Sequence, residues 1–319
     1  MTREGAPRRI LVTGAAGFIG GAVCALLRGQ GRSVAGLGRR APAKGRNPCG
    51  EFIVCDMTES AEAVSAALER AAPEAVVHLA APVPSHAGAA GWSLIEPTAR
   101  AAENLFTACA AMERPPKIVL GSSGAVYGGC PVGAAISERR APAPPTHYGV
   151  AKTLVEMLAV RAAQSAGLTI ACVRPFNVFG PGQKADRVVP SFTRQIVRIA
   201  EKGGGEIRVG NLDSHRDFVD VRDVAAAFAL MIDKGRGGSV YNVCSGRATK
   251  IRKVLDTLIS LAGLKGEVRV IGERLSAEHV PYQRGNPGKI QRMGWRARHS
   301  FRRTMADVFE EWRAEGRAK

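Results

Sequence analysis

The sequence predicts an α/β protein with a doubly wound parallel sheet and a smaller C-terminal α/β lobe. Three observations predict this fold. Short apolar runs alternate with alanine-rich segments of helical length, a glycine-rich turn follows the first apolar run, and the pattern changes after residue 174. Short apolar strands joined by helices form parallel sheets that are covered on both faces. Ligands bind such sheets at the carboxyl ends of the strands.

The elements expected in the first part of the chain alternate between strand and helix. Strands are expected at residues 10–13, 33–37, 52–55, 75–79, 118–121 and 169–173. Helices are expected at residues 17–28, 61–71, 99–112 and 148–166. After a loop rich in proline and glycine, the second part has expected helices at 192–202, 251–262 and 305–312, and expected strands at 207–209 and 240–243.

The glycine-rich turn at residues 13–20 (TGAAGFIG) lies between the first expected strand and the first expected helix. In such a turn one glycine permits the tight bend, one lets the backbone approach phosphate, and one lets the helix pack close to the strand. The N–H groups at the start of the helix then face the anion. We therefore expect residues 1–174 to form an NAD(P)-binding domain of Rossmann type, with returning segments near 206–246. Residues 175–319 are expected to form mainly a substrate-binding lobe.

Composition limits the classes of partner. The 319 residues include 45 Lys and Arg against 28 Asp and Glu, a net charge of +17. The basic residues are spread along the chain, which favours a surface that attracts small polyanions over a nucleic-acid partner. No apolar run approaches the roughly 18 residues of a membrane-spanning helix, and we expect a cytoplasmic protein with no membrane partner. The seven cysteines are scattered and contain no CxxC pair, so neither a metal site nor a disulfide framework is expected.

Tyr148 and Lys152 are four residues apart in an expected helix. At that spacing two side chains share one helix face, so the ammonium would lie near the phenol and lower its pKa. A tyrosine with a lowered pKa can act as an acid or base near neutral pH. Ser122 and Ser123 directly follow the fifth expected strand, where a hydroxyl can bond the same substrate oxygen that the tyrosine protonates.

Together these features resemble the extended short-chain dehydrogenase/reductases of the NAD-dependent epimerase/dehydratase family, which act on nucleotide sugars. The resemblance covers nearly the whole chain. It is carried by the following positions: 13–20, Asp56, 77–81 (VHLAA), Ser123, Tyr148, Lys152, 174–177 (RPFN), 180–182 (GPG) and 216–221 (RDFVDV).

The resemblance implies roles for individual residues. Ser123, Tyr148 and Lys152 would be the catalytic triad. The cofactor-binding residues would be Gly14, Gly17, Phe18, Ile19, Gly20, Asp56, Met57, Leu79, Ala80, Ala81, Tyr148, Lys152 and Pro175. The substrate-binding residues would be Ser122, Ser123, Asn177, Val188, Arg216 and Arg274. Asn177 and Arg216 would hold the diphosphate of the nucleotide sugar. A homodimer formed by the helices at 99–112 and 148–166 is also implied.

Within the family, the sequence is most similar to reductases of GDP-4-keto-6-deoxy-D-mannose. Family 4,6-dehydratases carry an acidic residue just after the catalytic hydroxyl, where this chain has Gly124 and Ala125. The expected reaction is therefore reduction of the C4 keto group of a nucleotide-linked 4-keto-6-deoxy sugar, GDP-linked by preference. The alternatives are an NAD-dependent nucleotide-sugar 4-epimerase and a non-catalytic nucleotide-sensing protein.

The end of the second expected strand indicates the cofactor. NAD-binding sites often place a carboxylate there to bond the ribose 2′-hydroxyl. This chain has Arg39 and Arg40 instead, whose guanidinium groups suit a 2′-phosphate. We expect NADPH, with NAD as the alternative.

Overall fold

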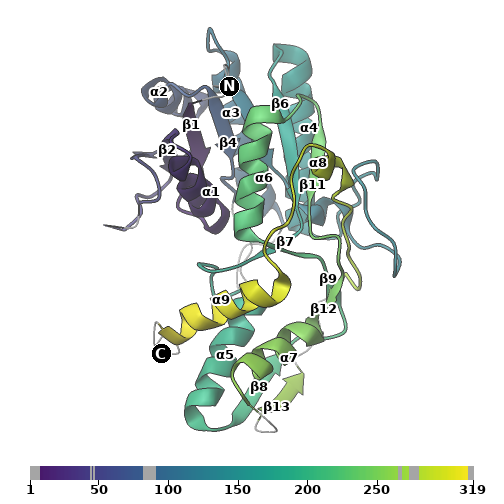
Figure 1. Cartoon of the computed structure of the whole chain (residues 1–319). Coiled ribbons are helices and arrows are strands. Elements are labelled where there is room, and N and C mark those ends of the chain that lie inside the picture. Colours follow the sequence, from purple (N-terminus) through teal and green to yellow (C-terminus); the bar gives the residue numbers. More distant parts are fainter. Residues whose placement is uncertain are drawn as a thin grey trace.

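The computed structural model describes residues 8–43, 45, 47–81, 91–264, 268–272 and 280–314. Its main feature is a seven-stranded, all-parallel sheet in the order β3-β2-β1-β4-β5-β6-β11 (Figure 1). The strands are β1 (Arg9–Thr13), β2 (Ser33–Gly38), β3 (Glu51–Val54), β4 (Ala75–His78), β5 (Lys117–Gly121), β6 (Ile170–Pro175) and β11 (Val240–Val243). This order, with its reversal beside β1, confirms the doubly wound fold expected from the sequence.

Helices cover both faces of this sheet. The first face carries α1 (Phe18–Gly29) and α6 (Val221–Lys234), which bury Val23 and Phe228 against the strands. The second face carries α2 (Ala61–Ala71), α3 (Trp92–Ala110) and α4 (His147–Ala166), which bury Leu68, Leu105 and Val155. Two separate apolar cores therefore hold the sheet between layers of helix.

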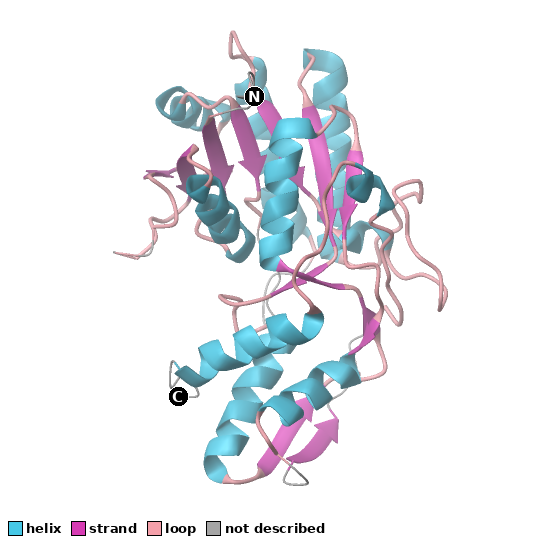
Figure 2. Ribbon diagram, viewed as in Figure 1, coloured by secondary structure: helices cyan, strands magenta, loops and turns pink. Residues whose placement is uncertain are grey.

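Register brings the ends of the central strands together. Thr13 lies beside Leu37 on one side and His78 on the other, and His78 lies beside Leu120. The arrowheads of these strands point toward the smaller lobe (Figure 2). Residues that follow β1, β4 and β5 are thus gathered at one edge of the sheet, between the two lobes.

The smaller lobe packs three helices around its own core. These are α5 (Val188–Lys202), α7 (Ile251–Leu261) and α9 (Phe301–Ala314), with the parallel pair β8 (Gly205–Val209) and β13 (Val268–Gly272) at the far side (Figure 1). Strand β8 lies at the start of the stretch from which returning segments were expected, but it stays in this lobe. The segments that return to the large sheet are α6 and β11.

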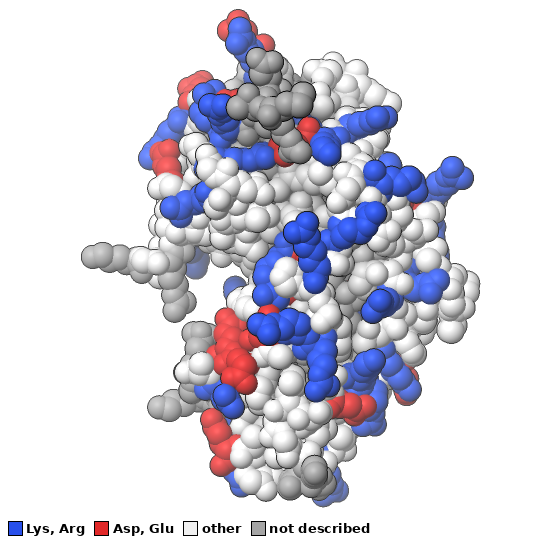
Figure 3. All heavy atoms as spheres, in the orientation of Figure 1, with Lys and Arg blue, Asp and Glu red and all other residues white. Residues whose placement is uncertain are grey.

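Short elements connect the lobes beside the strand ends. Strand β7 (Asn177–Phe179) pairs in parallel with β10 (Phe218–Asp220), and β9 (His215–Arg216) pairs antiparallel with β12 (Thr249–Lys250). A 3₁₀ helix, η1 (Gly124–Tyr127), follows β5, and α8 (Gly288–Arg292) packs near β11. Basic side chains are distributed over both lobes on the face that Figure 3 shows.

Candidate active site

The turn between β1 and α1 has no space for side chains at two of its glycines. Gly14 has a φ of 69°, and a Cβ there would lie 2.9 Å from the backbone nitrogen of Ala80. A Cβ on Gly20 would lie 2.2 Å from the carbonyl oxygen of Gly14. The glycines therefore bring the end of β4 and the first turn of α1 against the β1 turn.

The backbone N–H groups in the first turn of helix α1 have no side-chain cap. Gly17 precedes it in extended conformation, no side chain caps it, and its first turn, with Phe18 and Ile19, contains no acidic residue. The first N–H groups of a helix have no partner within the helix and carry partial positive charge. This end of α1 therefore fits the diphosphate of a dinucleotide, as the sequence predicts.

A buried hydroxyl holds the end of β4 in place. The Thr13 Oγ1 atom accepts hydrogen bonds from the backbone N–H groups of Leu79 and Ala80, both at 3.1 Å. The same oxygen lies 2.9 Å from Nδ1 of His78. Because its two lone pairs accept from the two amides, the hydroxyl donates its proton to Nδ1. Burial, with a smaller effect from Lys152, lowers the pKa of His78 to about 3, so this imidazole is neutral. Ala81 follows in the same segment.

The edge of the sheet at β2 and β3 carries the residues expected near the adenosine. Arg39 and Arg40 follow β2 and are exposed. Asp56 follows β3 and accepts hydrogen bonds from the N–H and hydroxyl of Thr58, at 3.0 and 2.7 Å. The Thr58 bonds, and to a lesser degree the charge of Arg39, hold the pKa of Asp56 below its usual value. Met57, the next residue, is buried.

Ser123 and Tyr148 meet at the carboxyl edge of the sheet. Ser123 follows β5 and caps η1, its Oγ accepting from the N–H of Ala125 at 3.1 Å. Tyr148 lies in the first turn of α4, whose N-cap is Thr146. Burial raises the pKa of Tyr148, although a hydrogen bond with Ser123 and the charge of Arg187 oppose the rise.

This result corrects the expected direction of the tyrosine pKa. The spacing predicted that Lys152 would lower it. In the structure the Lys152 ammonium lies 6.0 Å from the centre of the Tyr148 ring and donates to the carbonyl of Gly121 at 2.9 Å. Burial lowers the pKa of Lys152 to about 8. Desolvation therefore dominates for both groups, and Tyr148 is a protonated phenol at neutral pH.

Ser122, expected among the substrate-binding residues, lies beneath the site. Its side chain is buried and its Oγ donates to the carboxylate of Glu156, which is also bonded twice by Arg174. Only the next hydroxyl, Ser123, lies next to Tyr148. Alternation of side chains along an extended chain places Ser122 on the opposite side from Ser123, and a contact between Ser122 and substrate stays a prediction.

The expected diphosphate residues lie on the connecting strands. Arg216, in β9, is half-buried and donates to the backbone carbonyl of His215 at 3.0 Å. Burial lowers its pKa, and no carboxylate among the described residues opposes that effect. Such a guanidinium suits an anionic ligand. Asn177 begins β7 and Pro175 ends β6, while Val188 begins α5. Arg274 falls outside the described residues.

Two further residues organise this side of the site. Asp217 is fully buried, and its carboxylate accepts hydrogen bonds from Ser245, Gly246 and Gly285 at 2.7 to 3.0 Å. Burial raises its pKa to about 6, although these donors oppose the rise. Gln283 donates to the carbonyls at both ends of η1, at 3.0 and 2.9 Å, and accepts from Asn177 at 3.4 Å.

No role was expected from the sequence for Asp217, Glu156 or Gln283. Asp217 lies inside the RDFVDV stretch, and Glu156 follows Lys152 by one helical turn, so both gave a usable signal. Gln283 gave none, because it lies far along the chain from η1 and no local pattern connects them.

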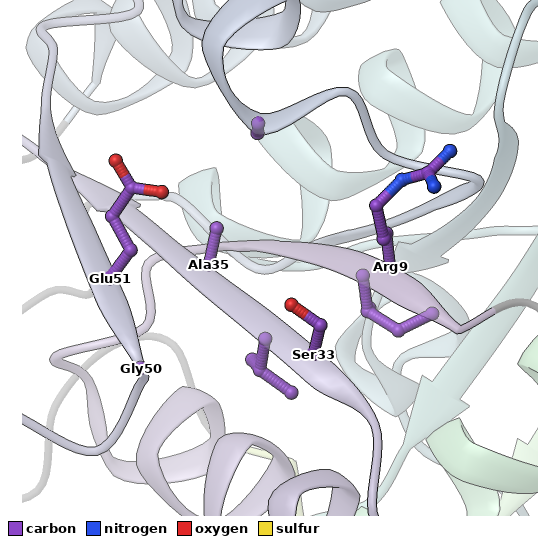
Figure 4. Close-up of a pocket in the computed structure, with 8 residues that line it drawn as sticks. Arg9, Ser33, Ala35, Gly50 and Glu51 are labelled. Atoms are coloured by element: carbon purple, nitrogen blue, oxygen red, sulfur yellow. The ribbon is translucent and has the colours of Figure 1, made fainter.

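A separate hollow of about 200 Å³ lies at the opposite edge of the sheet (Figure 4). Its lining includes Arg9, Ser33 and Glu51, the first residues of β1, β2 and β3. The amino ends of the strands form this hollow, so it is not part of the site at their carboxyl ends.

The sequence was compared with protein families and with individual known proteins. Residues 10–244 match the NAD dependent epimerase/dehydratase family. The GDP-6-deoxy-D-mannose reductase of Pseudomonas aeruginosa is 33% identical over 199 residues, which are 61% of this chain and 66% of that protein.

Two solved structures are similar over nearly their whole length. The RMD protein of Pseudomonas aeruginosa, in complex with NADPH, has a TM-score of 0.81 and 28% identity, covering 97% of this chain and 99% of that one. The UDP-glucose 4-epimerase of Thermus thermophilus, in complex with NAD, has a TM-score of 0.84 and 29% identity, covering 96% and 99%. In the described part of this chain, no helix has the length and apolar character to cross a membrane.

Proposed function

The chain belongs to the NAD dependent epimerase/dehydratase family, and we propose that it is an NADPH-dependent reductase of a nucleotide-linked 4-keto-6-deoxy sugar, GDP-linked by preference. One observation carries this proposal. Ser123, Tyr148 and Lys152 lie together at the carboxyl edge of the sheet, beside a glycine turn that fits a dinucleotide. Neither a phosphate-binding module nor a structural domain needs that combination of groups.

The proposed chemistry uses the protonation states found in the site. NADPH, when bound, supplies the hydride for the C4 carbonyl carbon. Tyr148 donates its phenolic proton to the C4 oxygen, and its raised pKa keeps that proton available at neutral pH. Ser123 bonds the same oxygen. Lys152, charged below about pH 8, stabilises the phenolate that remains and binds the ribose.

The proposed substrate contacts follow from Arg216 on β9, which has no carboxylate partner among the described residues. Arg216 would grip the diphosphate, and Asn177 would donate to it from β7. The buried carboxylate of Asp217 supports this arrangement because it fastens the loops at Ser245 and Gly285 beside Arg216. The name of the Pseudomonas aeruginosa reductase supports a GDP-linked 6-deoxy sugar.

The proposed preference for NADPH rests on charge at the end of β2. Arg39 and Arg40 are exposed there, and the carboxylate that follows β3, Asp56, has Arg39 as a neighbour. Two guanidinium groups favour a 2′-phosphate over a 2′-hydroxyl. The NADPH complex of the similar Pseudomonas aeruginosa protein supports this choice.

A 4,6-dehydratase is not favoured. A Cβ on Gly124, the residue after Ser123, would lie 3.0 Å from the ring of Phe176. An acidic side chain there would have to displace that ring. A side chain at the position that carries the acid in family dehydratases therefore requires this ring to shift by a few tenths of an ångström.

The second candidate is an NAD-dependent nucleotide-sugar 4-epimerase. The similarity to the UDP-glucose 4-epimerase of Thermus thermophilus, which was solved with NAD, favours it. An epimerase retains its cofactor and returns the hydride, so it shows no net use of NADPH.

The decisive experiment follows NADPH and NADH absorbance with GDP-, UDP-, dTDP- and CDP-linked 4-keto-6-deoxy sugars. We expect oxidation of NADPH with the GDP-linked sugar. If no sugar in the panel causes oxidation, the reductase proposal fails. Release of NAD from the denatured protein, together with interconversion of UDP-glucose and UDP-galactose, would then establish the epimerase.

A further inference from the structure

A buried ion pair lies directly beneath the proposed catalytic residues. Glu156 accepts hydrogen bonds from Arg174, at 2.8 Å through Nε and more closely through Nη2, and from the Ser122 hydroxyl. The Arg174 and Glu156 side chains are only 5% and 11% exposed. Burying an ion pair costs solvation energy that mutual attraction only partly repays, so stability alone is a poor reason for it.

The pair connects the two elements that carry the catalytic groups. Glu156 follows Lys152 by one turn of α4 and Tyr148 by two turns, so all three share a helix face. The end of β5 is fastened to that face twice: Gly121 by the Lys152 ammonium and Ser122 by the Glu156 carboxylate. The next residue, Ser123, therefore has its backbone fixed with respect to Tyr148.

We propose that Glu156 is a positioning residue of this site, which holds the Ser123 hydroxyl against Tyr148 and keeps Lys152 protonated through its negative charge. The inference deepens the proposed function and rests on it. Its test therefore includes a measurement that needs no substrate.

The charge part of this proposal depends on what surrounds Lys152 and Glu156. The titratable and charged groups that face them are His78 on β4, Tyr127 on η1, Tyr148 on α4, and Cys172 and Arg174 on β6.

Most of these groups are neutral near pH 8. Burial brings the pKa of His78 to about 3 and that of Tyr127 to about 12. Burial also raises the pKa of Tyr148 above its usual value of 10.0 and that of Cys172 well above 9.0. Within this described set, Glu156 is thus the anion near Lys152, and Arg174 is the other cation.

The sign of the effect follows. Burial lowers the pKa of Lys152 to about 8, and the neighbouring Cys172 and, after it, the carboxylate of Glu156 oppose that fall. Glu156→Gln removes the negative charge and leaves the Arg174 cation unpaired, and both changes lower the pKa of Lys152 further. Because lysine is charged below its pKa, the alkaline limb of the rate profile should move to lower pH, by about 1 unit.

The experiment compares kcat against pH for wild type, Glu156→Gln and the matched control Glu69→Gln, which makes the same exchange on another helix. Glu69 is exposed on α2, so the same loss of a carboxylate there should leave the alkaline limb in place. Trace labelling of amines, quantified by mass spectrometry over the same pH range, reports the Lys152 pKa without substrate.

The outcomes separate the two proposals. A lowered Lys152 pKa in Glu156→Gln, with a lowered kcat and an unshifted control, supports the role of Glu156. An unchanged labelling profile overturns it, even if kcat falls. If wild type turns over none of the sugars, the proposed function fails, while the labelling result still decides whether Glu156 sets the charge of Lys152.

A second, independent feature is a pair of thiols between α1 and the loop that leads into β3. The Sγ atoms of Cys24 and Cys49 are 3.1 Å apart, and both side chains are buried. Arg28, one turn after Cys24, donates to the carbonyl of Pro48 at 3.3 Å. The hydrogen bond with Cys24, and the charge of Arg28, lower the pKa of Cys49 although burial opposes this.

We propose that Cys24 and Cys49 are a peroxide-oxidation site that forms a disulfide. The Cys49 thiolate attacks one oxygen of hydrogen peroxide, the O–O bond breaks, and hydroxide leaves and is protonated to water. The Cys24 sulfur then attacks the resulting sulfenic acid. The S–S bond forms, the S–O bond breaks, and a second water leaves with the Cys24 proton. Two thiols are oxidised by two electrons, and the peroxide is reduced to two waters.

The consequence concerns the proposed cofactor site. The bond would tie α1, which begins at the glycine turn, to the loop that starts at Arg39 and Arg40. Cys49 is 4% exposed, but its neighbour Gly50 is exposed, so a small oxidant has a short path to the thiolate.

The test treats native protein with stoichiometric hydrogen peroxide, alkylates it after denaturation and maps the seven cysteines by mass spectrometry. We expect a Cys24–Cys49 linked peptide that dithiothreitol reverses. It should form before Cys55 and Cys130 react, although these are more exposed. Cys24→Ser should leave Cys49 as an unlinked oxidised thiol. Preferential oxidation of Cys55 or Cys130, or no linked peptide at all, overturns the proposal.

Discussion

Tyr148 is the residue on which the proposed reaction depends most. Tyr148→Phe removes the proton donor and leaves the ring, so kcat should fall by roughly 10²- to 10⁴-fold, the usual contribution of a positioned acid. NADPH affinity, measured by fluorescence titration, should change by no more than about twofold, because the phenol is one of many proposed cofactor contacts. Near-normal turnover in this variant would show that another group protonates the substrate.

At the scale of residues, the sequence predicted groups whose spacing is local. Tyr148 and Lys152 are one turn apart, and the structure brings them to one face of α4. The sequence predicted the wrong direction for the pKa of Tyr148, because desolvation depends on which distant segments cover the phenol. Gln283 was missed for a related reason: its bonds to η1 join positions more than 150 residues apart.

At the scale of elements, the strands of the large sheet were predictable from the sequence, while the first residues of the helices were less so. Helix α3 was expected from residue 99 but begins at Trp92. Pro97 lies within it, where proline lacks the N–H that the helix uses, so the local pattern gave no sign of the preceding turn. The helix that begins at residue 147 was expected from 148, and in the structure Thr146 caps it by accepting from the N–H of Gly149.

The end of β2 carries the prediction about cofactor choice. Arg39→Ala combined with Arg40→Ala should raise the KM for NADPH by about 10- to 100-fold, since a hydrogen bond to a charged group contributes about 1.5–3 kcal/mol. The KM for NADH should change little, because NADH lacks the 2′-phosphate. Arg70→Ala is the matched control: Arg70 is an exposed arginine of the same domain, paired with Glu51. An equal rise in KM for NADPH and NADH would mean that these arginines do not bind the 2′-phosphate.

At the scale of the whole molecule, the distribution of charge bears on which ligands the protein attracts. The net charge of +17 is spread over the surface rather than confined to one patch on the face in Figure 3. This distribution favours attraction of small polyanions, such as NADPH and a nucleotide sugar, to the proposed site at the carboxyl edge of the sheet. The sequence predicted the net charge but not its distribution, because exposure is set by packing.

The proposed homodimer makes a prediction about the outer face of α4. Val150, Met157 and Val160 lie on one side of this helix and are 39%, 64% and 55% exposed. An apolar stripe on a surface helix is typical of an interface, and a second copy of α3 and α4 would cover it. We expect wild type to sediment at about twice the chain mass of 33.7 kDa. Met157→Glu should give monomers at micromolar concentration, because the interface would bury an unpaired charge. The matched control is Val132→Glu, at a loop position that is 85% exposed, which should remain dimeric. A monomeric wild type, or a dimer that tolerates glutamate at residue 157, would place any interface elsewhere.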